Sequence, residues 1–428
     1  MIKWTLKARQ SIWFVPGVYS LASIILTTMV ILVDTVFANL VQGILPGILF
    51  TNVDLGATIL SSIATAILTM TTISFSTIMV VLTTYSSQFS PRTLQDFMTE
   101  KSTLRVLGIF VGSFIYTVLT LLFMKDGLEG ERVLSSGVGV ILAIICVGYF
   151  VFFVHHVSRS IQVSQLIERL MEEGLESVEK KKQNADKGML QFVENEPFSY
   201  TEKVSFSLHN TGYIQVIETT NLAKKAKKLN VFISFKKRIG DFVTDRTVIG
   251  EIYYLKEKKE ELDIASYVQI GEERTTLQDA EFALQKLTEV ALRAISPGIN
   301  DPNTANNCIR YMSRLLISFG EIDSDALLYL DEEKQQRIAI RQRTFEEILY
   351  TAFYQIRIYG KNDISVILAI LECLILIAEG SQSKIRRKIN SMHDFLVGSI
   401  QESQFEPLDL VKLEEKKAVL KERLRENN

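Results

Sequence analysis

Hydroxyl side chains recur with helical spacing along an otherwise apolar stretch, residues 58–90. Alternating steps of four and three residues meet Ser or Thr at nine of ten positions, and Met79 is the exception. A spacing that averages 3.5 residues places these side chains on one face of an α-helix. On a membrane helix, hydroxyls either bond to a neighbouring helix or line a wet path for ions and small polar solutes. The candidate pore-lining or helix-packing residues are Thr58, Ser62, Thr65, Thr69, Thr72, Ser76 and Thr83.

Turn-forming residues are concentrated in a second segment, residues 296–304. Two prolines, one glycine and three Asn or Asp side chains in nine residues predict a tight turn between two helices. Asn303 or Thr304 is expected to cap the second helix. We interpret the turn as structural, and the alternative is a small-ligand site at a helix N-terminus. The candidate residues are Arg293, Ser296, Pro297, Gly298, Asn300, Asp301 and Pro302.

The sequence contains none of the common catalytic or metal-binding motifs. We find no Gly-rich phosphate loop with a lysine, no HExxH, no CxxC and no GxSxG. Cys146, Cys308 and Cys373 are far apart in apolar context and are expected to be buried thiols. His155 and His156 are neighbours on a predicted helix and cannot easily share a metal ion. We therefore expect no enzymatic activity, no metal and no cofactor.

Charge divides the chain into a membrane part and a water-soluble part. Residues 1–156 hold only 15 of the 96 charged side chains. Four apolar segments of membrane-spanning length lie in this part, and none has an Asp, Glu, Lys or Arg near its middle. That absence disfavours an ion-coupled transporter, because such proteins usually keep an ionisable residue there. The predicted spans are 12–33, 57–84, 106–124 and 133–154, with an interfacial helix around residues 40–50.

Lysine and arginine are biased toward residues 1–11 and 90–105, which predicts a multi-pass protein with both termini in the cytoplasm. Residues 157–203 are expected to form a juxtamembrane helix, continuous with the fourth span, and a linker. The run Lys180–Lys182 is interpreted as a solvated helix end, with contact to anionic lipid as the alternative. Residues 204–274 predict a small β module, residues 275–406 a helical bundle that includes a helix over 325–341, and residues 407–428 a charged C-terminal helix.

Three motifs together resemble one family of bacterial predicted membrane proteins. They are Ser-Gln-Phe-Ser-Pro-Arg at 87–92, Gly-Asp-Phe-Val at 240–243, and Ala-Leu-Arg-Ala-Ile-Ser-Pro-Gly-Ile-Asn-Asp-Pro at 291–302. The chain is similar to this family, domain of unknown function 2254 (DUF2254), to about residue 400. The resemblance implies a bacterial inner-membrane protein and supplies no catalytic residues.

Two functional hypotheses follow for this α-helical membrane protein with four transmembrane helices and a cytosolic α+β region. The first is a homo-oligomeric channel or pore that is lined by the hydroxyl-rich second span and regulated by the soluble part. The second is a membrane-anchored sensor or scaffold whose soluble part binds a ligand or a protein. The expected partners are the lipid bilayer, further copies of the chain, and ions or a small ligand. A net charge of −2 gives no reason to expect nucleic acid.

Overall fold

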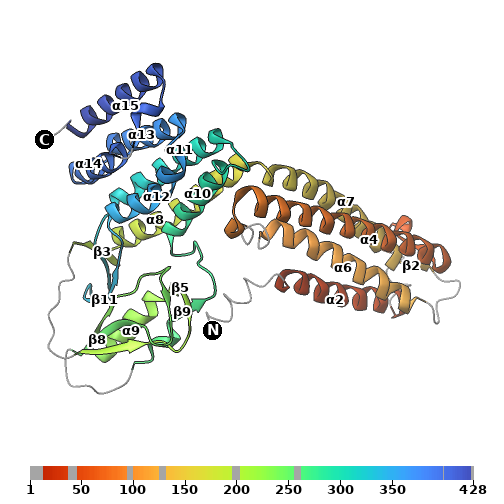
Figure 1. The fold of residues 1–428 in the computed structure, drawn as a ribbon. Helices are drawn as coiled ribbons and strands as arrows, with labels where there is room; N and C mark the ends of the chain where they lie inside the picture. The colour runs from red at the N-terminus through yellow and green to blue at the C-terminus, as the bar shows by residue number, and fades with distance from the viewer. Residues whose placement is uncertain are drawn as a thin grey trace. The chain divides into compact units, whose positions relative to one another are not determined.

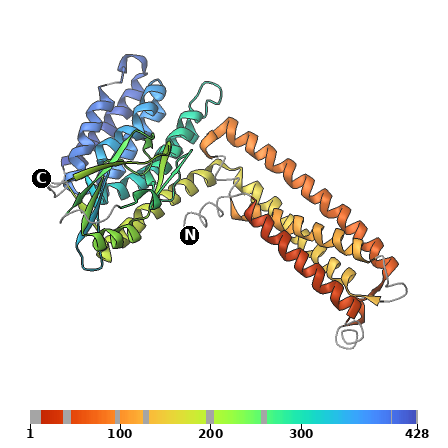
Figure 2. The same ribbon diagram turned by 90° about the horizontal axis from the view of Figure 1, so that it is seen from below.

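The computed structural model describes residues 13–36, 46–93, 100–124, 132–194, 203–254, 262–398 and 400–425. The chain folds as two compact units, residues 1–162 and 163–428. The first unit contains four long helices that run side by side, and the second combines β-sheet with a group of helices (Figures 1 and 2).

The four long helices of the first unit are long and apolar enough to cross a membrane, as the sequence predicts. The second of them continues from an α-helix into one π-helical turn, Tyr85–Phe89, and Ser90 is extended ahead of Pro91. The helix thus ends before Pro91, because a residue before proline avoids the helical region. The helices are α2 (Phe14–Val36), α4 (Val53–Thr84), α6 (Lys101–Phe123) and α7 (Ser135–Ser160).

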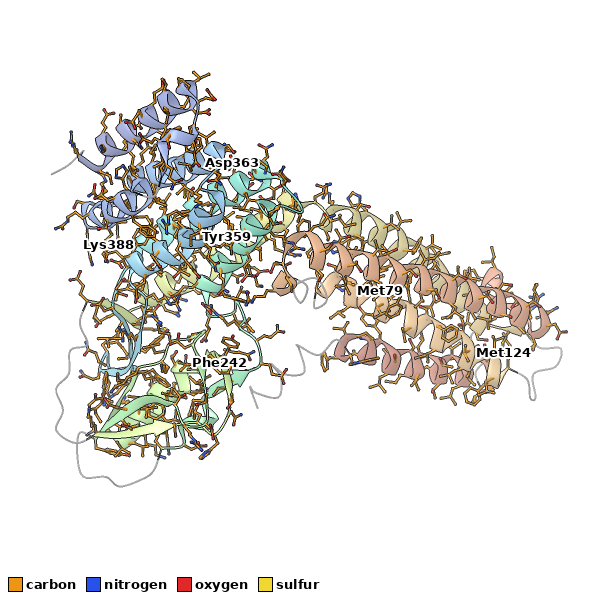
Figure 3. All side chains as sticks on the ribbon, viewed as in Figure 1. Met79, Met124, Phe242, Tyr359, Asp363 and Lys388 are labelled. Carbon is orange, nitrogen blue, oxygen red and sulfur yellow. The ribbon has the colours of Figure 1, made fainter. Side chains whose placement is uncertain are left out.

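Small residues allow α6 to approach α2 closely. A Cβ atom built on Gly108 would lie 2.7 Å from the ring of Tyr19, and one on Gly112 would lie 2.7 Å from Oγ of Ser23. The GxxxG spacing of these two glycines thus marks a real helix contact. At the far end of α6, Met124 packs with Leu60 and Val133 in a buried cluster (Figure 3).

The loops at one end of the four helices are joined by a pair of two-residue strands. Strand β1 (Thr51–Asn52) pairs antiparallel with β2 (Arg132–Val133). Of the interfacial helix expected around residues 40–50, only the 3₁₀ turn η1 (Gly47–Leu49) falls among the described residues. The basic segment 1–11 and most of the loop 125–132 lie outside them.

The juxtamembrane helix is not continuous with the fourth span. Helix α7 ends at Ser160, and α8 (Val163–Asp186) begins after a break at residues 161–162. The prediction of one unbroken helix was therefore wrong. The break coincides with the boundary between the two compact units. The buried side chains of α7 pack within the first unit and those of α8 within the second, so the two helices need not share one apolar face.

A six-stranded mixed sheet lies in the second unit. Only the contact between its third and fourth strands is parallel. Helix α9 (Thr219–Leu229) packs against this sheet, and its buried residues share a core with the strands (Figure 1). In spatial order the strands are β3 (Leu190–Val193), β10 (Ala326–Leu330), β11 (Gln336–Arg341), β6 (Val231–Phe235), β8 (Val248–Tyr254) and β4 (Lys203–Ser207).

A second, three-stranded antiparallel sheet completes the β region. Its order is β7 (Phe242–Val243), β5 (Gly212–Ile217) and β9 (Val268–Gly271), with the 3₁₀ turn η4 (Ile264–Ser266) before β9. Strands β5 to β9 lie within residues 204–274, where the sequence predicts a small β module, and β4 begins one residue before it.

The helix predicted over residues 325–341 was wrong, because this segment is the β10–β11 hairpin. Its turn is held by Asp331, whose Oδ1 accepts hydrogen bonds from the backbone N–H groups of Glu333 and Gln335 at 2.9 Å. Sheet pairing on both sides overrides the helix propensity of the segment, since β10 pairs with β3 and β11 with β6. Strand β3 also falls inside the segment that the sequence assigns to a linker.

The remaining helices surround a common apolar core. Helix α8 packs against α10 and α11, α11 against α13, and α13 against α15. Most of α13 is buried. The helices are α10 (Ala280–Ala294), α11 (Pro302–Glu321), α12 (Phe345–Gly360), α13 (Ile364–Glu379), α14 (Ser383–Val397) and α15 (Pro407–Arg425), with the 3₁₀ turn η5 (Glu402–Gln404) before α15.

Candidate functional site

The hydroxyl stripe lies on the outward face of α4. All seven of its candidate residues are exposed on the protomer. The buried face of the same helix repeats with heptad spacing and carries Leu60, Ile67, Ser74 and Val81. Because each residue advances an α-helix by about 100°, the stripe is centred about 180° from this buried face. From Thr65 onward the stripe therefore points away from α6 and α7, which α4 packs against.

Most hydroxyl groups of the stripe donate a hydrogen bond to a backbone carbonyl oxygen of the same helix. Oγ1 of Thr69 donates to the carbonyl oxygen of Thr65 at 2.9 Å, and Oγ1 of Thr72 donates to that of Leu68 at 2.9 Å. Thr58, Ser62, Thr65 and Thr83 donate in the same way. These bonds lower the cost of placing the stripe in an apolar environment. The oxygen atoms keep acceptor capacity that water or a cation can use.

Apolar side chains flank the stripe on both sides and are exposed as well. Leu68 and Phe75 lie on one flank, and Leu55 and Ile73 lie on the other. Met79, which interrupts the stripe, is 61% exposed (Figure 3). The outward surface of α4 thus has a polar centre with apolar margins.

A shallow groove of about 510 Å³ adjoins the start of the stripe. Thr58 and Ser62 line it from α4, and Val140, Ile144 and Val147 line it from α7. Nearly all of its exposed lining is apolar, so it suits a hydrocarbon chain or a neighbouring helix better than a polar ligand.

The end of α4 is anchored to the end of α7. The hydroxyl of the fully buried Tyr85 donates to the carbonyl oxygen of Ser160 at 2.5 Å. Nearby on α7, Nε2 of His156 lies 3.0 Å from a carboxylate oxygen of Glu100. The ring of His156 also stacks on that of Phe152. Among the described residues no group of three or more His, Cys, Asp or Glu is arranged to hold a metal.

The turn at 296–302 joins α10 to α11 by hydrogen bonds within the turn. Asp301 caps α11, with Oδ1 accepting from the Thr304 backbone N–H at 3.1 Å and Oδ2 from the Thr304 hydroxyl at 2.6 Å. The predicted cap at Asn303 or Thr304 was therefore wrong. Helix α11 starts two residues earlier because Pro302 suits the first helical position.

The other residues of this turn lie at the surface. Asn300 adopts a left-handed conformation with φ of 53°, and the Ser296 hydroxyl donates to the Arg293 carbonyl oxygen at 2.6 Å. Pro297 and Gly298 are exposed. The structure thus places this set together in one exposed turn and places the hydroxyl stripe in a different compact unit.

Residues 9–375 match the family model described as predicted membrane protein (DUF2254). The chain belongs to this family. Two relatives of the DUF2254 protein are uncharacterized protein Mb1321c of Mycobacterium bovis and uncharacterized protein Rv1290c of Mycobacterium tuberculosis. Each is 26% identical over 341 residues, which cover 77% of this chain. The chain spans 65% of the length of these relatives. No solved structure matches it.

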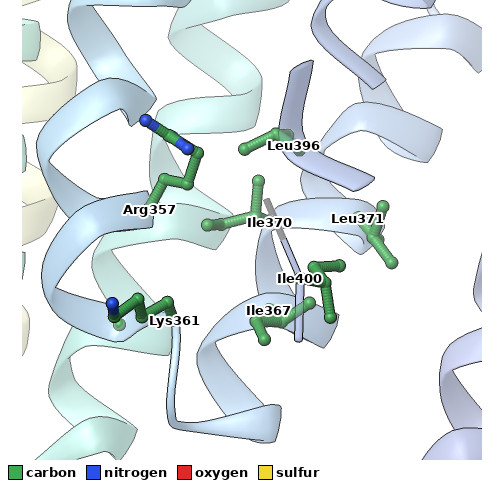
Figure 4. Close-up of a pocket in the computed structure, with 8 residues that line it drawn as sticks. Arg357, Lys361, Ile367, Ile370, Leu371, Leu396 and Ile400 are labelled. Atoms are coloured by element: carbon green, nitrogen blue, oxygen red, sulfur yellow. The ribbon is translucent and has the colours of Figure 1, made fainter. Parts of the chain in front are cut away.

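A small apolar cavity of about 20 Å³ lies among α12, α13 and α14 of the DUF2254 protein. Figure 4 shows the aliphatic side chains of Ile367, Ile370 and Leu396 beside the basic side chains of Arg357 and Lys361. A volume of about 10–15 Å³ accommodates one water molecule, so this cavity is too small for an organic ligand.

Asp34, a buried acid of the membrane part, is not among the site residues predicted from the sequence. Its carboxylate accepts hydrogen bonds from the backbone N–H groups of Leu134 and Ser135 at 2.7 and 3.1 Å, and so caps α7 from α2. The position of this acid directly after an apolar span could have suggested a helix cap. The sequence alone does not indicate which helix N-terminus the carboxylate contacts.

Proposed function

We propose that this protein forms a homo-oligomeric channel or pore in the bacterial inner membrane, with α4 of each copy facing the central axis. The observation that carries the proposal is the direction of the hydroxyl stripe, which lies opposite the face that α4 buries against its own protomer. A ring of such helices would place acceptor oxygens around a wet path for ions or small polar solutes. The second unit, in the cytoplasm, would regulate opening.

The apolar margins of the stripe support this arrangement. In a ring, Leu68 and Phe75 of one copy would meet Leu55 and Ile73 of the next, while the polar centre faces inward. Hydroxyl and other small side chains also let membrane helices approach closely. A dry dimer through the same stripe is the competing arrangement.

Thiol labelling can distinguish a wet stripe from a dry one. The three native cysteines are buried, which keeps background labelling low. We expect Thr69→Cys to react with a charged, membrane-impermeant methanethiosulfonate in liposomes. Leu68→Cys, one residue away on the apolar margin, is the matched control and should react at least about tenfold more slowly.

Ion flux from proteoliposomes tests the activity itself. We expect Thr69→Leu to reduce the flux and Thr69→Ser, which keeps the hydroxyl, to leave it near the native rate. A native protein that conducts nothing, or a Thr69→Leu variant as active as the native one, would contradict the channel. In that case a membrane-anchored sensor or scaffold without enzymatic activity is the function to pursue, and a polar cavity in the second unit favours it.

A further inference from the structure

A polar cavity of about 210 Å³ lies inside the second unit. Helix α8 contributes Ser177 and Lys181 to its wall, the start of α10 contributes Asp279 and Glu281, and strand β10 contributes Tyr329. The positive ends of two helices border it, because Thr219 begins α9 and Ala280 begins α10.

The wall on one side is built from the turn before β7. Arg238 lines the cavity, and Gly240 follows it with φ of 88°. A Cβ atom on Gly240 would lie 2.2 Å from Oδ2 of Asp279, so only glycine allows this approach. The first residue of the Gly-Asp-Phe-Val motif therefore packs directly against Asp279, the residue before α10.

The charged groups around the cavity are paired, with one exception. Arg274 lies 2.7 Å from Asp279, Arg343 lies 3.2 Å from Glu281, and Arg238 lies 3.5 Å from Asp241. Lys180, the neighbour of Lys181, lies 2.7 Å from Glu176.

The exception is Lys181, which forms no ion pair within the described part of the chain. Its amine makes one long hydrogen bond of 3.4 Å, to the Gln342 side-chain oxygen. Burial lowers the pKa of this amine, and the charges of Glu281 and Asp279 oppose that shift. An amine in this setting gains from an anion that enters the cavity and favours its charged form.

Two hydroxyl groups, those of Ser177 and Tyr329, also line this cavity. Ser177 is one helical turn before Lys181, is 5% exposed, and its Oγ has no hydrogen-bond partner among the described residues. Most helical serines of this kind bond to a carbonyl oxygen one turn earlier. Burial raises the pKa of Tyr329 to about 12, so its hydroxyl remains a donor. A buried donor without a partner is costly and is normally satisfied by water or a ligand.

We propose that this cavity binds a small organic anion, whose phosphate or carboxylate group pairs with Lys181 and accepts hydrogen bonds from Ser177 and Tyr329. An adjoining cavity of about 270 Å³ shares Asn184, Thr219 and Tyr329 with the first. It provides room for the rest of such a molecule. Asp279 and Glu281 in the cavity wall are already paired with Arg274 and Arg343. Lys181 therefore remains as the cationic group with which the anion can pair.

Isothermal titration calorimetry on the detergent-solubilised full chain tests this site. The probes are inorganic phosphate, adenosine monophosphate and citrate, so the phosphate and carboxylate classes are separated. We expect saturable binding of one class by the native protein and by Lys182→Gln, which removes a neighbouring charge that does not line the cavity and that pairs with Glu321. Lys181→Gln should bind at least about tenfold more weakly, since a charge-assisted contact is lost.

The proposal is overturned if no probe binds the native protein at millimolar concentration, or if Lys181→Gln binds as tightly as Lys182→Gln. Should Lys181→Gln fail to fold, Ser177→Ala and Tyr329→Phe provide the same test, because each removes one hydroxyl and keeps the packing. Each should weaken binding several-fold, and unchanged binding in both would also reject the site. The readout is binding and not flux, so its outcome is independent of the proposed channel.

Discussion

Asp34 on α2 holds the N-terminus of α7, with its Oδ2 atom 3.1 Å from the backbone nitrogen of Ser135 and its Oδ1 atom 2.7 Å from that of Leu134. The first N–H groups of a helix have no partner within that helix, so a carboxylate from another helix both satisfies them and joins the two elements. Asp34 is only 4% exposed, which makes water a poor substitute.

We therefore expect Asp34→Ala to destabilise the membrane unit by about 0.5–2 kcal/mol, the usual range for a lost helix cap. Asp34→Asn should lose less, because its amide oxygen can still accept one hydrogen bond. The measurement is the midpoint of thermal unfolding in detergent, followed by size-exclusion chromatography. Asp54→Ala is the control, since Asp54 is exposed in the first turn of α4. Equal losses in Asp34→Ala and Asp54→Ala would count against the cap.

The close contact between α2 and α6 predicts that Gly112 tolerates no larger side chain. A Cβ atom there would lie 3.1 Å from the backbone oxygen of Tyr19, which cannot rotate away. We expect Gly112→Val to lower stability by about 1–3 kcal/mol, the range for overpacking. Gly148→Val on α7 is the matched control, because a Cβ atom there meets nothing within 4 Å. Thermal midpoints of the two variants should differ clearly, and matching midpoints would contradict the contact.

Glu251 in β8 predicts an acid-dependent loss of stability. Hydrogen bonds from Lys236 at 2.7 Å, from Tyr253 at 2.7 Å and from Lys203 at 2.9 Å lower the pKa of this buried carboxyl to about 2 from an ordinary 4.5. The folded state thus releases this proton more readily than the unfolded state. The resulting stability is complete above pH 4.5 and is lost as the pH falls toward 2.

We expect Glu251→Gln to be less stable than the native protein by about 2 kcal/mol at pH 7, since hydrogen bonds to charged groups contribute about 1.5–3 kcal/mol. The difference should shrink between pH 4.5 and 2. Thermal unfolding at pH 7, 4.5 and 3 measures it. Glu332→Gln is the control, because Glu332 is a 71% exposed partner of Lys224 and should change little at any pH. A gap between native and Glu251→Gln that stays constant with pH would refute the assignment.

Periodicity made the membrane part predictable from the sequence. The hydroxyl spacing gives one face of α4 whatever the helix packs against, and the heptad-spaced set at Leu60, Ile67 and Val81 gives the opposite face. Periodicity does not indicate which other helices each face contacts. The cap that Asp34 makes on α7 joins residues far apart in the chain, so it required the structure.

The hairpin at residues 326–341 shows where local preference fails. Ala, Leu, Glu, Lys and Gln dominate this segment and all favour helix. Pairing of β10 with β3 and of β11 with β6 outweighs that preference. The sequence feature that could have indicated the hairpin is Asp331 ahead of Glu-Glu-Lys. Asp331 forms the turn, and its Oδ2 atom also accepts a hydrogen bond from Nε of Arg337 at 2.8 Å.

The run Lys180–Lys182 shows the same limit for a site. Three lysines at a helix end predict a solvated surface, and Lys180 is 60% exposed as expected. Lys181 instead faces a cavity closed by Tyr329 of β10 and Gln342, which directly follows β11. Because the sequence predicted a helix over residues 325–341, it could not predict that this segment forms part of the cavity wall.

The parallel contact between β6 and β11 has a consequence for biosynthesis. Ile233 pairs with Ile338, so β6 has an unpaired edge on the growing polypeptide until residue 341 has left the ribosome. Throughout that interval an apolar strand is open to incorrect partners, while the four membrane helices, which precede it in the chain, are already available for insertion. Nascent chains arrested before residue 336 should therefore need a chaperone that chains arrested after α12 do not.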